Sequence, residues 1–509
     1  MRVLVVTSSL AYDIAKEVVG RIKDHEVVVY RLDYPIASLM TTTYISKELS
    51  GKVDSSYDYI LIPGLALGDA SVIKNVVKCE VFKGPKYLGD LPEVIKLLES
   101  GVKLSTTKPA DEVLKEYLSR NYESELRKLL NERNYVFHIK SLGVPLRPPP
   151  IVLAYEVMLR SVDDYRNTLS KIERACKLDI DLVIIGSPVI HEVPIKVFND
   201  LISTVRDVLG KPVGVDLPVD TVGKLSAEFD LIMNVSGEGI KSLSSYSDKA
   251  LVIVPNDASN ANSCIASLIS SIQLARSMSF SKLIIDPILR PPQLGLTKSL
   301  MSYYKLSREL EYPLMMGLSN VYELMDSDTH SVIALLTSIA MELGVSTLLV
   351  TEESAKSYNA VAEAVRAREM VYRAYLRKSP PIDVGIDLLV VKEKRRRGIK
   401  PLSNCVRSIY VGKDELPPRI TDEYYFRIYV DHDNNYLVVD VINNRSGECV
   451  VRYLGIDALS ICRKVLSDFG DLISRDHYMY LSYELCKAEI ALKLRRSYVQ
   501  DEPLFGLDF

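Results

Sequence analysis

Tryptophan is absent from this chain of 509 residues, and glutamine occurs only three times. A scarcity of thermolabile amides is typical of a heat-adapted source. The seven cysteines are scattered without a CxxC pair, which argues against a disulfide or zinc framework and for reduced thiols in a cytoplasm. No apolar run is long enough to cross a bilayer, and the first residues predict a β-strand rather than a signal peptide. We therefore expect a cytoplasmic protein without a membrane partner.

The net charge is only −3, so no global field would attract nucleic acid. Hydrophobic residues make up 47% of the chain and charged residues 25%, as in soluble globular proteins, and the length predicts two to four domains. Proline clusters at 147–150 and 378–381 interrupt the periodic segments. They predict an N-terminal α/β domain over 1–147, a central domain over 148–378 and a small C-terminal α+β domain over 379–509.

The central domain alternates apolar runs with helical patterns, which is typical of parallel β/α units. An open doubly wound sheet is the alternative, but eight units without a glycine-rich GxGxxG turn favour a closed (β/α)8 TIM barrel. The tail instead predicts strands followed by helices, including a first strand at 386–391. The eight apolar runs of the central domain are 151–157, 182–186, 212–217, 231–236, 250–255, 282–287, 312–318 and 347–350.

Polar side chains follow several of these runs at the point where each strand ends. Asp286 closes one strand, Asp216 another, and Asn234 the strand after that. The carboxyl ends of parallel strands meet at one rim of a barrel, where barrel enzymes carry their active sites. Asp286 could accept two N–H bonds from a flat, donor-rich ligand, although each of these residues could instead cap a loop.

Weaker candidates surround these three residues. Glu156 ends the first strand and could be a general acid, and Asn320 follows the seventh strand with an amide that both donates and accepts. Ser187 follows a small-residue gap where a ligand could approach. Arg290 could bind an anion or stack on a ring, although a surface ion pair is the simpler interpretation. No metal-binding motif is present.

These strand ends resemble those of the pterin-binding enzymes, the family of dihydropteroate synthase and the methyltetrahydrofolate:corrinoid methyltransferases. The similar segments are VGVDL at 213–217, LIMNVSG at 231–237 and LIIDP at 283–287. The whole chain is similar to archaeal dihydropteroate synthase-related proteins, with matching tail segments at 483–489 and 498–501. The resemblance implies a pterin, as substrate or cofactor, whose amide and amino edge is held by Asp286 with Asp216 and Asn234 beside it. It implies a transferase of folate or methanopterin-type cofactor biosynthesis or of one-carbon transfer.

The chain departs from the synthase pattern where that enzyme holds a diphosphate. The synthase pattern has basic residues after strands seven and eight, whereas here the segments are Ser319-Asn320-Val321-Tyr322 and Thr351-Glu352-Glu353. Carboxylates would repel a diphosphate unless cations such as Arg290 or Mg²⁺ compensate. The methyltransferase branch has an asparagine beside pterin N5 at the position of Asn320, and its acceptor would be a corrinoid on a separate partner protein. A non-catalytic pterin-binding protein and an unrelated barrel enzyme are the alternative functions. The chain could also form a homodimer.

Overall fold

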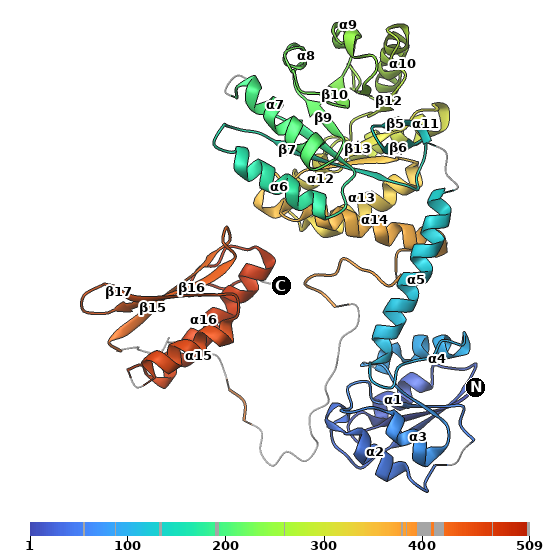
Figure 1. The fold of residues 1–509 in the computed structure, drawn as a ribbon, viewed down its shortest axis with the longest axis vertical. Helices are drawn as coiled ribbons and strands as arrows, with labels where there is room; N and C mark the ends of the chain where they lie inside the picture. Colours follow the sequence, from blue (N-terminus) through green and yellow to red (C-terminus); the bar gives the residue numbers. More distant parts are fainter. Residues whose placement is uncertain are drawn as a thin grey trace. The chain divides into compact units, whose positions relative to one another are not determined.

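The computed structural model describes residues 1–509 except 54–55, 87, 132–134, 189–192, 259, 378–379, 383, 394–408, 412–421, 471 and 506–509. The chain divides into two compact units, Met1–Pro401 and Leu402–Phe509. The first unit contains a parallel sheet, a small hairpin and an eight-stranded barrel, and the second contains an antiparallel sheet with two helices (Figure 1).

The N-terminal sheet is wholly parallel, with the strand order β2-β1-β3-β4. Hydrophobic side chains are buried on both of its faces, as is usual for parallel sheets covered by helices. Its strands are β1 (Arg2–Thr7), β2 (Glu26–Arg31), β3 (Tyr59–Ile62) and β4 (Glu80–Lys83). The helices of this region are α1 (Tyr12–Val19), α2 (Thr42–Leu49), α3 (Ser71–Val77), α4 (Leu91–Glu99) and α5 (Ala110–Asn131), with short 3₁₀ turns at Ala37–Leu39 and Leu88–Asp90.

The central sheet is a closed barrel of eight parallel strands, which confirms the predicted TIM barrel and excludes an open doubly wound sheet. The strands pair in the order β12-β11-β10-β9-β8-β7-β14-β13. A parallel bridge between Ile285 and Leu314 joins the first strand of this order to the last, and the Ile285 N–H donates to the Pro313 carbonyl at 2.9 Å. The strands are β7 (Val152–Met158), β8 (Leu182–Gly186), β9 (Val213–Asp216), β10 (Leu231–Val235), β11 (Ala250–Ile253), β12 (Leu283–Ile285), β13 (Met315–Gly317) and β14 (Thr347–Val350).

Helices surround the barrel, and their apolar faces pack against the outward side chains of the strands (Figure 1). They are α6 (Tyr165–Lys177), α7 (Ile195–Ser203) continued by a π-helical segment (Thr204–Val208), α8 (Val219–Val222), α9 (Glu238–Ser242), α10 (Ala261–Ser277), α11 (Leu296–Glu309), α12 (Ser319–Tyr322), α13 (Thr329–Leu343) and α14 (Ala360–Arg377), with 3₁₀ turns at Ser244–Tyr246 and Ala355–Ser357. Asn260 begins α10 by accepting hydrogen bonds from two backbone N–H groups, as an N-cap residue should.

A β-hairpin that the sequence analysis did not predict packs against the barrel interior. Its strands are β5 (Tyr135–Ile139) and β6 (Leu142–Pro145), and it precedes the predicted boundary at 148. Ile139 and Val144 belong to the same buried cluster as the inward-facing Ala154, Ile184 and Ile284 of the barrel strands. The hairpin therefore supplies apolar side chains to the barrel core, and the C-terminal ends of the strands, where barrel proteins usually bind their ligands, remain the candidate rim.

The second unit has a three-stranded antiparallel sheet, β15 (Tyr424–Asp431), β16 (Tyr436–Asn443) and β17 (Cys449–Gly455), packed against α15 (Ala458–Phe469) and α16 (Arg475–Leu494). The two tail segments that carry the family resemblance contact each other. The Tyr498 hydroxyl donates to Oε2 of the buried Glu484 at 2.7 Å, and Lys487 forms an ion pair with the same carboxylate at 2.7 Å. The resemblance in the tail therefore reflects a buried polar network that holds the terminal segment on α16.

The strand predicted at 386–391 is wrong. The described residues after α14 form no regular element there; instead Val384, Ile386 and Leu388 pack onto Met370 and Ala374 of α14. Their alternation with polar residues imitates a strand, but their hydrophobic partners are on a helix. Of the helices in the described part of the chain, none combines the length and hydrophobicity that a membrane span requires.

Candidate functional site

Three carboxyl groups occupy inward-facing positions at the C-terminal end of the barrel strands. Glu156 follows the inward-facing Ala154 by two residues on β7, and Asp286 follows the inward-facing Ile284 by two residues after β12. Asp216 is the last residue of β9, whose Val213 and Val215 face the helices. Because side chains alternate along a strand, all three acids are expected to point toward the barrel mouth. The strand-end pattern in the sequence thus corresponds to one rim.

Asn234 reaches this rim through an irregularity in β10. Leu231 and Met233 face the barrel interior whereas Ile232 and Val235 face the helices, so strict alternation would send Asn234 outward. The pairing of β10 with β11 shifts register between Ile232 and Val235, and Asn234 has a left-handed φ of 57°. Asparagine tolerates this conformation better than most residues. The bulge re-aims the side chain, as β-bulges next to active sites commonly do.

The bulge brings Asn234 into contact with Asp216. Asn234 Nδ2 donates to Asp216 Oδ2 at 2.8 Å. The amide thereby has a fixed orientation, with its carbonyl oxygen left as an acceptor for a ligand. Asp216 is partly exposed and Asn234 is exposed, so both can be reached from solvent. The pairing of these two predicted residues makes one acceptor-rich group.

Glu156 is the buried neighbour of this pair. Burial raises the pKa of Glu156 well above its usual range, and the nearby charge of Asp216 and a hydrogen bond with it raise the pKa further. This upward shift of the pKa favours the protonated form of Glu156. A hydrogen bond between two carboxyl groups also requires that one of them be protonated. Within the described residues, Glu156 Oε1 is buried and has no hydrogen-bond partner. A buried polar atom without a hydrogen bond lowers the stability of the folded chain unless a ligand or water molecule bonds to it.

Asp286 is buried and held by two donors that both reach the same oxygen. Its Oδ1 accepts from the Ile288 N–H at 2.7 Å and from the Tyr303 hydroxyl at 2.8 Å. Burial raises the pKa of Asp286 to about 6, and these two hydrogen bonds oppose the shift. Ile288 has a φ of 65°, which is strained for a β-branched residue and costs about 1–3 kcal/mol. Strain of this kind is often found where a loop holds a functional group in place.

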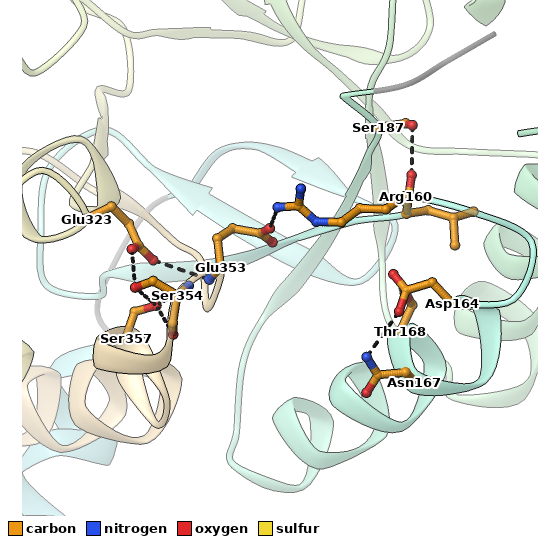
Figure 2. Close-up of polar contacts among 10 residues, drawn as sticks. Arg160, Asp164, Asn167, Thr168, Ser187, Glu323, Glu353, Ser354 and Ser357 are labelled. Atoms are coloured by element: carbon orange, nitrogen blue, oxygen red, sulfur yellow. Dashed lines mark hydrogen bonds and ion pairs between the residues drawn. The ribbon is translucent and has the colours of Figure 1, made fainter. Parts of the chain in front are cut away.

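The other three of the four weaker candidates, Asn320, Arg290 and Ser187, occupy supporting positions. Asn320 Nδ2 donates to the Leu289 carbonyl at 3.0 Å, so its amide N–H group is bound to the loop after β12 while its carbonyl oxygen keeps acceptor capacity. The Arg290 guanidinium donates to the Ala258 carbonyl and thus links the loops after β11 and β12. The Ser187 hydroxyl donates to the Leu159 carbonyl at 2.7 Å (Figure 2). These contacts give Ser187 and Arg290 loop-holding roles.

The cations near the end of β14 face carboxylates of the same chain. Figure 2 shows Arg160, from the loop after β7, forming an ion pair with Glu353 across the rim. Arg174 pairs with the buried Glu352 in the same way. Lys356 lies 3.4 Å from Asp326 and also donates to the Met325 carbonyl at 2.9 Å. The acidic residues that the sequence places after strand eight therefore already neutralise the nearby basic residues.

Glu323 is a further carboxylate in this part of the rim and adds to its acidic character. Glu323 accepts from the Ser354 hydroxyl at 2.6 Å and from the Glu353 N–H at 3.2 Å (Figure 2). Those bonds connect the loop after β13 to the loop after β14. Because Arg160, Arg174 and Lys356 are each paired with a carboxylate, this described part of the rim offers an anionic ligand group little net attraction.

The sequence analysis missed Tyr303 and Ile288, the two donors to Asp286. Tyr303 is on the buried face of α11, where a tyrosine is most simply interpreted as a core residue. Its hydrogen bond spans 17 residues, so no local pattern could indicate it. The Asp-Pro pair at 286–287 does predict a turn, and a turn in which the aspartate accepts from the N–H two residues later would have identified Ile288.

Comparisons with known proteins agree with the resemblance seen in the sequence. Residues 422–501 match the family model PterinBD-DUF4346. The chain is 28% identical to the uncharacterized protein MJ0107 of Methanocaldococcus jannaschii over 99% of both chains. Among solved structures, it is 19% identical to dihydropteroate synthase of Xanthomonas albilineans, covering 47% of this chain and 97% of that one with a TM-score of 0.35. Dihydropteroate synthase of Thermus thermophilus is also 19% identical, with 47% and 98% covered and a TM-score of 0.35. The family match lies in the second unit of the chain, whereas the similarity to MJ0107 extends over almost the whole chain.

Proposed function

We propose that this chain is a pterin-binding transferase whose ligand lies across the C-terminal rim of the barrel, held by Asp216, Asn234 and Asp286. The observation that carries the proposal is the collection of oriented acceptors at the C-terminal ends of β9, β10 and β12, above all the buried Asp286. A pterin presents N–H donors at N3 and at its 2-amino group, and an ionised carboxylate is an acceptor only. Charge-assisted hydrogen bonds of this kind are stronger than neutral ones. The PterinBD-DUF4346 match supports the same ligand class.

Proton transfer in this proposal falls to Glu156, with Asn320 as an electrostatic partner. A buried acid with a raised pKa can hold a proton at neutral pH and deliver it to a bound ring, and Glu156 Oε1 is uncommitted within the described residues. The Asn320 carbonyl oxygen can accept from a protonated ring nitrogen such as N5. Protonation of N5 would make that ring nitrogen a better leaving group when its methyl group is transferred to a nucleophile, because the N5–CH3 bond electrons then remain on a neutral amine.

The charge balance of the rim favours a pterin without a diphosphate. Arg160, Arg174 and Lys356 near β14 are each paired with a carboxylate, so among the described residues of that part of the rim a diphosphate would meet no uncompensated positive charge. Arg290, in the loop after β12, contacts a neutral carbonyl and is the cation that a diphosphate would have to use. We therefore favour one-carbon transfer from a tetrahydropterin in folate or methanopterin-type metabolism. The acceptor would be a corrinoid on a separate partner protein. The proposal also includes three expectations from the sequence. The domain boundaries lie at 147/148 and 378/379, the protein is cytoplasmic, and it forms a homodimer.

Calorimetric titration of the purified chain tests the proposal directly. The three ligands are a methylated tetrahydropterin, 6-hydroxymethyl-dihydropterin and the diphosphate of that alcohol. Tightest binding of the methylated compound is expected. Preference for the diphosphate, especially with Mg²⁺, would instead support condensation of the synthase type. Binding of the methylated pterin without methyl transfer to cob(I)alamin, generated with a chemical reductant, or to a reduced corrinoid protein would indicate a non-catalytic binding protein. No heat from any of the three ligands would refute pterin binding.

Substitution of Asn234 separates the role of its amide from the role of its backbone. Asn234→Ala and Asn234→Gly both remove the hydrogen bond to Asp216, so both should weaken pterin binding by about 3- to 10-fold. Only alanine is strained at a φ of 57°, so its variant should be less stable than the glycine variant by about 1 kcal/mol. Chemical unfolding and pterin titration of both variants measure the two effects. Unchanged affinity in both would remove Asn234 from the site.

A further inference from the structure

Tyr303 contacts the proposed pterin site only through Asp286. It lies on α11, its side chain is fully buried, and its hydroxyl donates to Asp286 Oδ1 at 2.8 Å. Burial and the adjacent carboxyl group raise the pKa of Tyr303 well above its usual range, so the phenol keeps its proton and remains a donor. Tyrosine rings buried in a core usually find one partner for the hydroxyl. Here that partner is the residue with the central role in ligand binding.

The two donors to Asp286 use up one of its oxygens. A carboxylate oxygen offers about two lone-pair sites, and Oδ1 already accepts from Ile288 N–H and from Tyr303. Among the described residues, no hydrogen bond reaches Oδ2. A ligand would therefore meet Oδ2 alone, rather than both oxygens as the sequence analysis expected. The second donor of a pterin edge would then share Oδ2 or reach the acceptors at Asp216 and Asn234.

Tyr303 and the Ile288 N–H are the donors that stabilise the charge of Asp286, because two other groups nearby, Cys264 and Arg290, bond elsewhere. Cys264 on α10 faces the same loop, where its thiol donates to the Pro287 carbonyl at 3.6 Å, and burial raises its pKa to about 11, so it stays neutral. Arg290 follows in the loop after β12, but its guanidinium donates to the Ala258 carbonyl. Burial raises the pKa of Asp286 to about 6, and the tyrosine hydrogen bond is the larger of the two opposing effects.

We propose that Tyr303 is a positioning residue of the pterin site, which keeps Asp286 ionised and presents Oδ2 to the ligand. The proposal rests on the proposed function, since it concerns how that site takes hold of a donor-bearing ring. It also makes ligand capture depend on pH, because a protonated Asp286 would offer a donor where the pterin edge itself donates. Tyr303 touches neither ligand nor reacting atoms in this account.

The test is the pH dependence of pterin affinity in Tyr303→Phe, measured by calorimetry from pH 5.5 to 8.5 with the tightest-binding pterin. Loss of one hydrogen bond to ionised Asp286 should raise the pH midpoint of pterin affinity, the pH at which half of Asp286 is protonated, by roughly one unit. Affinity should then fall about 5-fold relative to the wild type at pH 6 and recover to within about 2-fold at pH 8.5. Tyr322→Phe is the matched control, because Tyr322 is equally buried and its hydroxyl donates to the Thr351 carbonyl at 2.7 Å, not to Asp286. Its midpoint should equal that of the wild type.

Incorporation of 3-fluorotyrosine at position 303 covers the case in which the phenylalanine variant does not fold. The more acidic phenol is a stronger donor in nearly the same volume, so the midpoint should move downward. A midpoint unchanged in both variants, or an affinity loss of equal size at every pH, would overturn the positioning role while leaving pterin binding intact. Failure of the wild type to bind any pterin would overturn the proposed function together with this inference.

Discussion

Asp286→Asn is expected to weaken pterin binding by about 1.5–3 kcal/mol, or about 10- to 150-fold. The variant keeps the size of the side chain and can still accept from Tyr303 and Ile288. It replaces the negative charge with an amide that is neutral and can place a donor against the donors of the ring. Calorimetric titration at pH 8, where wild-type Asp286 is ionised, measures the loss. Asp220→Asn, on the exposed surface of α8, should bind as the wild type does.

The same variant should be more stable than the wild type above pH 6. The pKa of Asp286 is about 6 in the folded chain, above its ordinary value of 3.8, so the folded state binds this proton more tightly than the unfolded state does. The associated stability is present below about pH 4 and is lost as the pH rises through 6. A shift of this size corresponds to about 3 kcal/mol, and asparagine does not carry this penalty. A gain on the order of 1–3 kcal/mol at pH 8 is therefore expected from denaturant unfolding.

A gain in stability combined with a loss of affinity would identify Asp286 as a residue kept for function at the expense of the fold. A variant that is less stable than the wild type at pH 8 would instead mean that the carboxylate is a structural partner of the loop. Unchanged pterin affinity would remove Asp286 from the site even if the stability result were as expected.

Arg368→Ala is expected to destabilise the barrel by about 2–4 kcal/mol without changing pterin affinity. Arg368, on α14, forms an ion pair with Asp181 at 2.6 Å and with Asp179 at 3.0 Å, and also donates to the Ile151 carbonyl at 3.3 Å. Asp181 in turn accepts from the Leu153 N–H at 2.8 Å. These contacts tie the last barrel helix to the beginnings of β7 and β8. Contacts at this end of a barrel maintain stability, whereas chemistry occurs at the other end.

The loss of folding stability caused by Arg368→Ala should increase as the pH rises. Burial already raises the pKa of Asp181, and the guanidinium opposes that shift, so removing it raises the pKa further. A carboxyl group with a raised pKa contributes stability at low pH and loses it as the pH rises. Denaturant unfolding at pH 5 and pH 8 tests the trend, with Arg366→Ala on the exposed side of α14 as the control. The Arg366 guanidinium donates to the Asp387 carbonyl and forms no ion pair among the described residues, so its loss should cost the same free energy, about 1 kcal/mol, at both pH values. Adding Asp181→Asn to Arg368→Ala should restore part of the loss; no recovery would contradict the ion-pair explanation.

Strand-end residues were the most predictable part of the site. Buried parallel strands are continuous apolar runs, and their direction is the same around a barrel, so Asp216, Asn234 and Asp286 could be assigned to one rim before any contact was known. Local pattern failed where hydrophobic partners lay elsewhere in the chain. The segment at 386–391 alternates like a strand but packs on a helix, and the hairpin that packs against the barrel interior has short strands that resemble loop sequence.

The sequence by itself determined the β/α alternation, the rim to which the polar strand ends belong and the acidic character of the segment after strand eight, because these follow from side-chain period, strand direction and residue type. Only the tertiary structure decided that the barrel closes between Ile285 and Leu314 and that a left-handed residue in β10 turns Asn234 toward Asp216. It also decided that Tyr303 and the Ile288 N–H together occupy one oxygen of Asp286. Such contacts depend on the angle and register at which distant segments pack. A displacement of the donor by about an ångström, or a rotation by a few tens of degrees, is enough to break a hydrogen bond, so the residue pattern alone does not determine them.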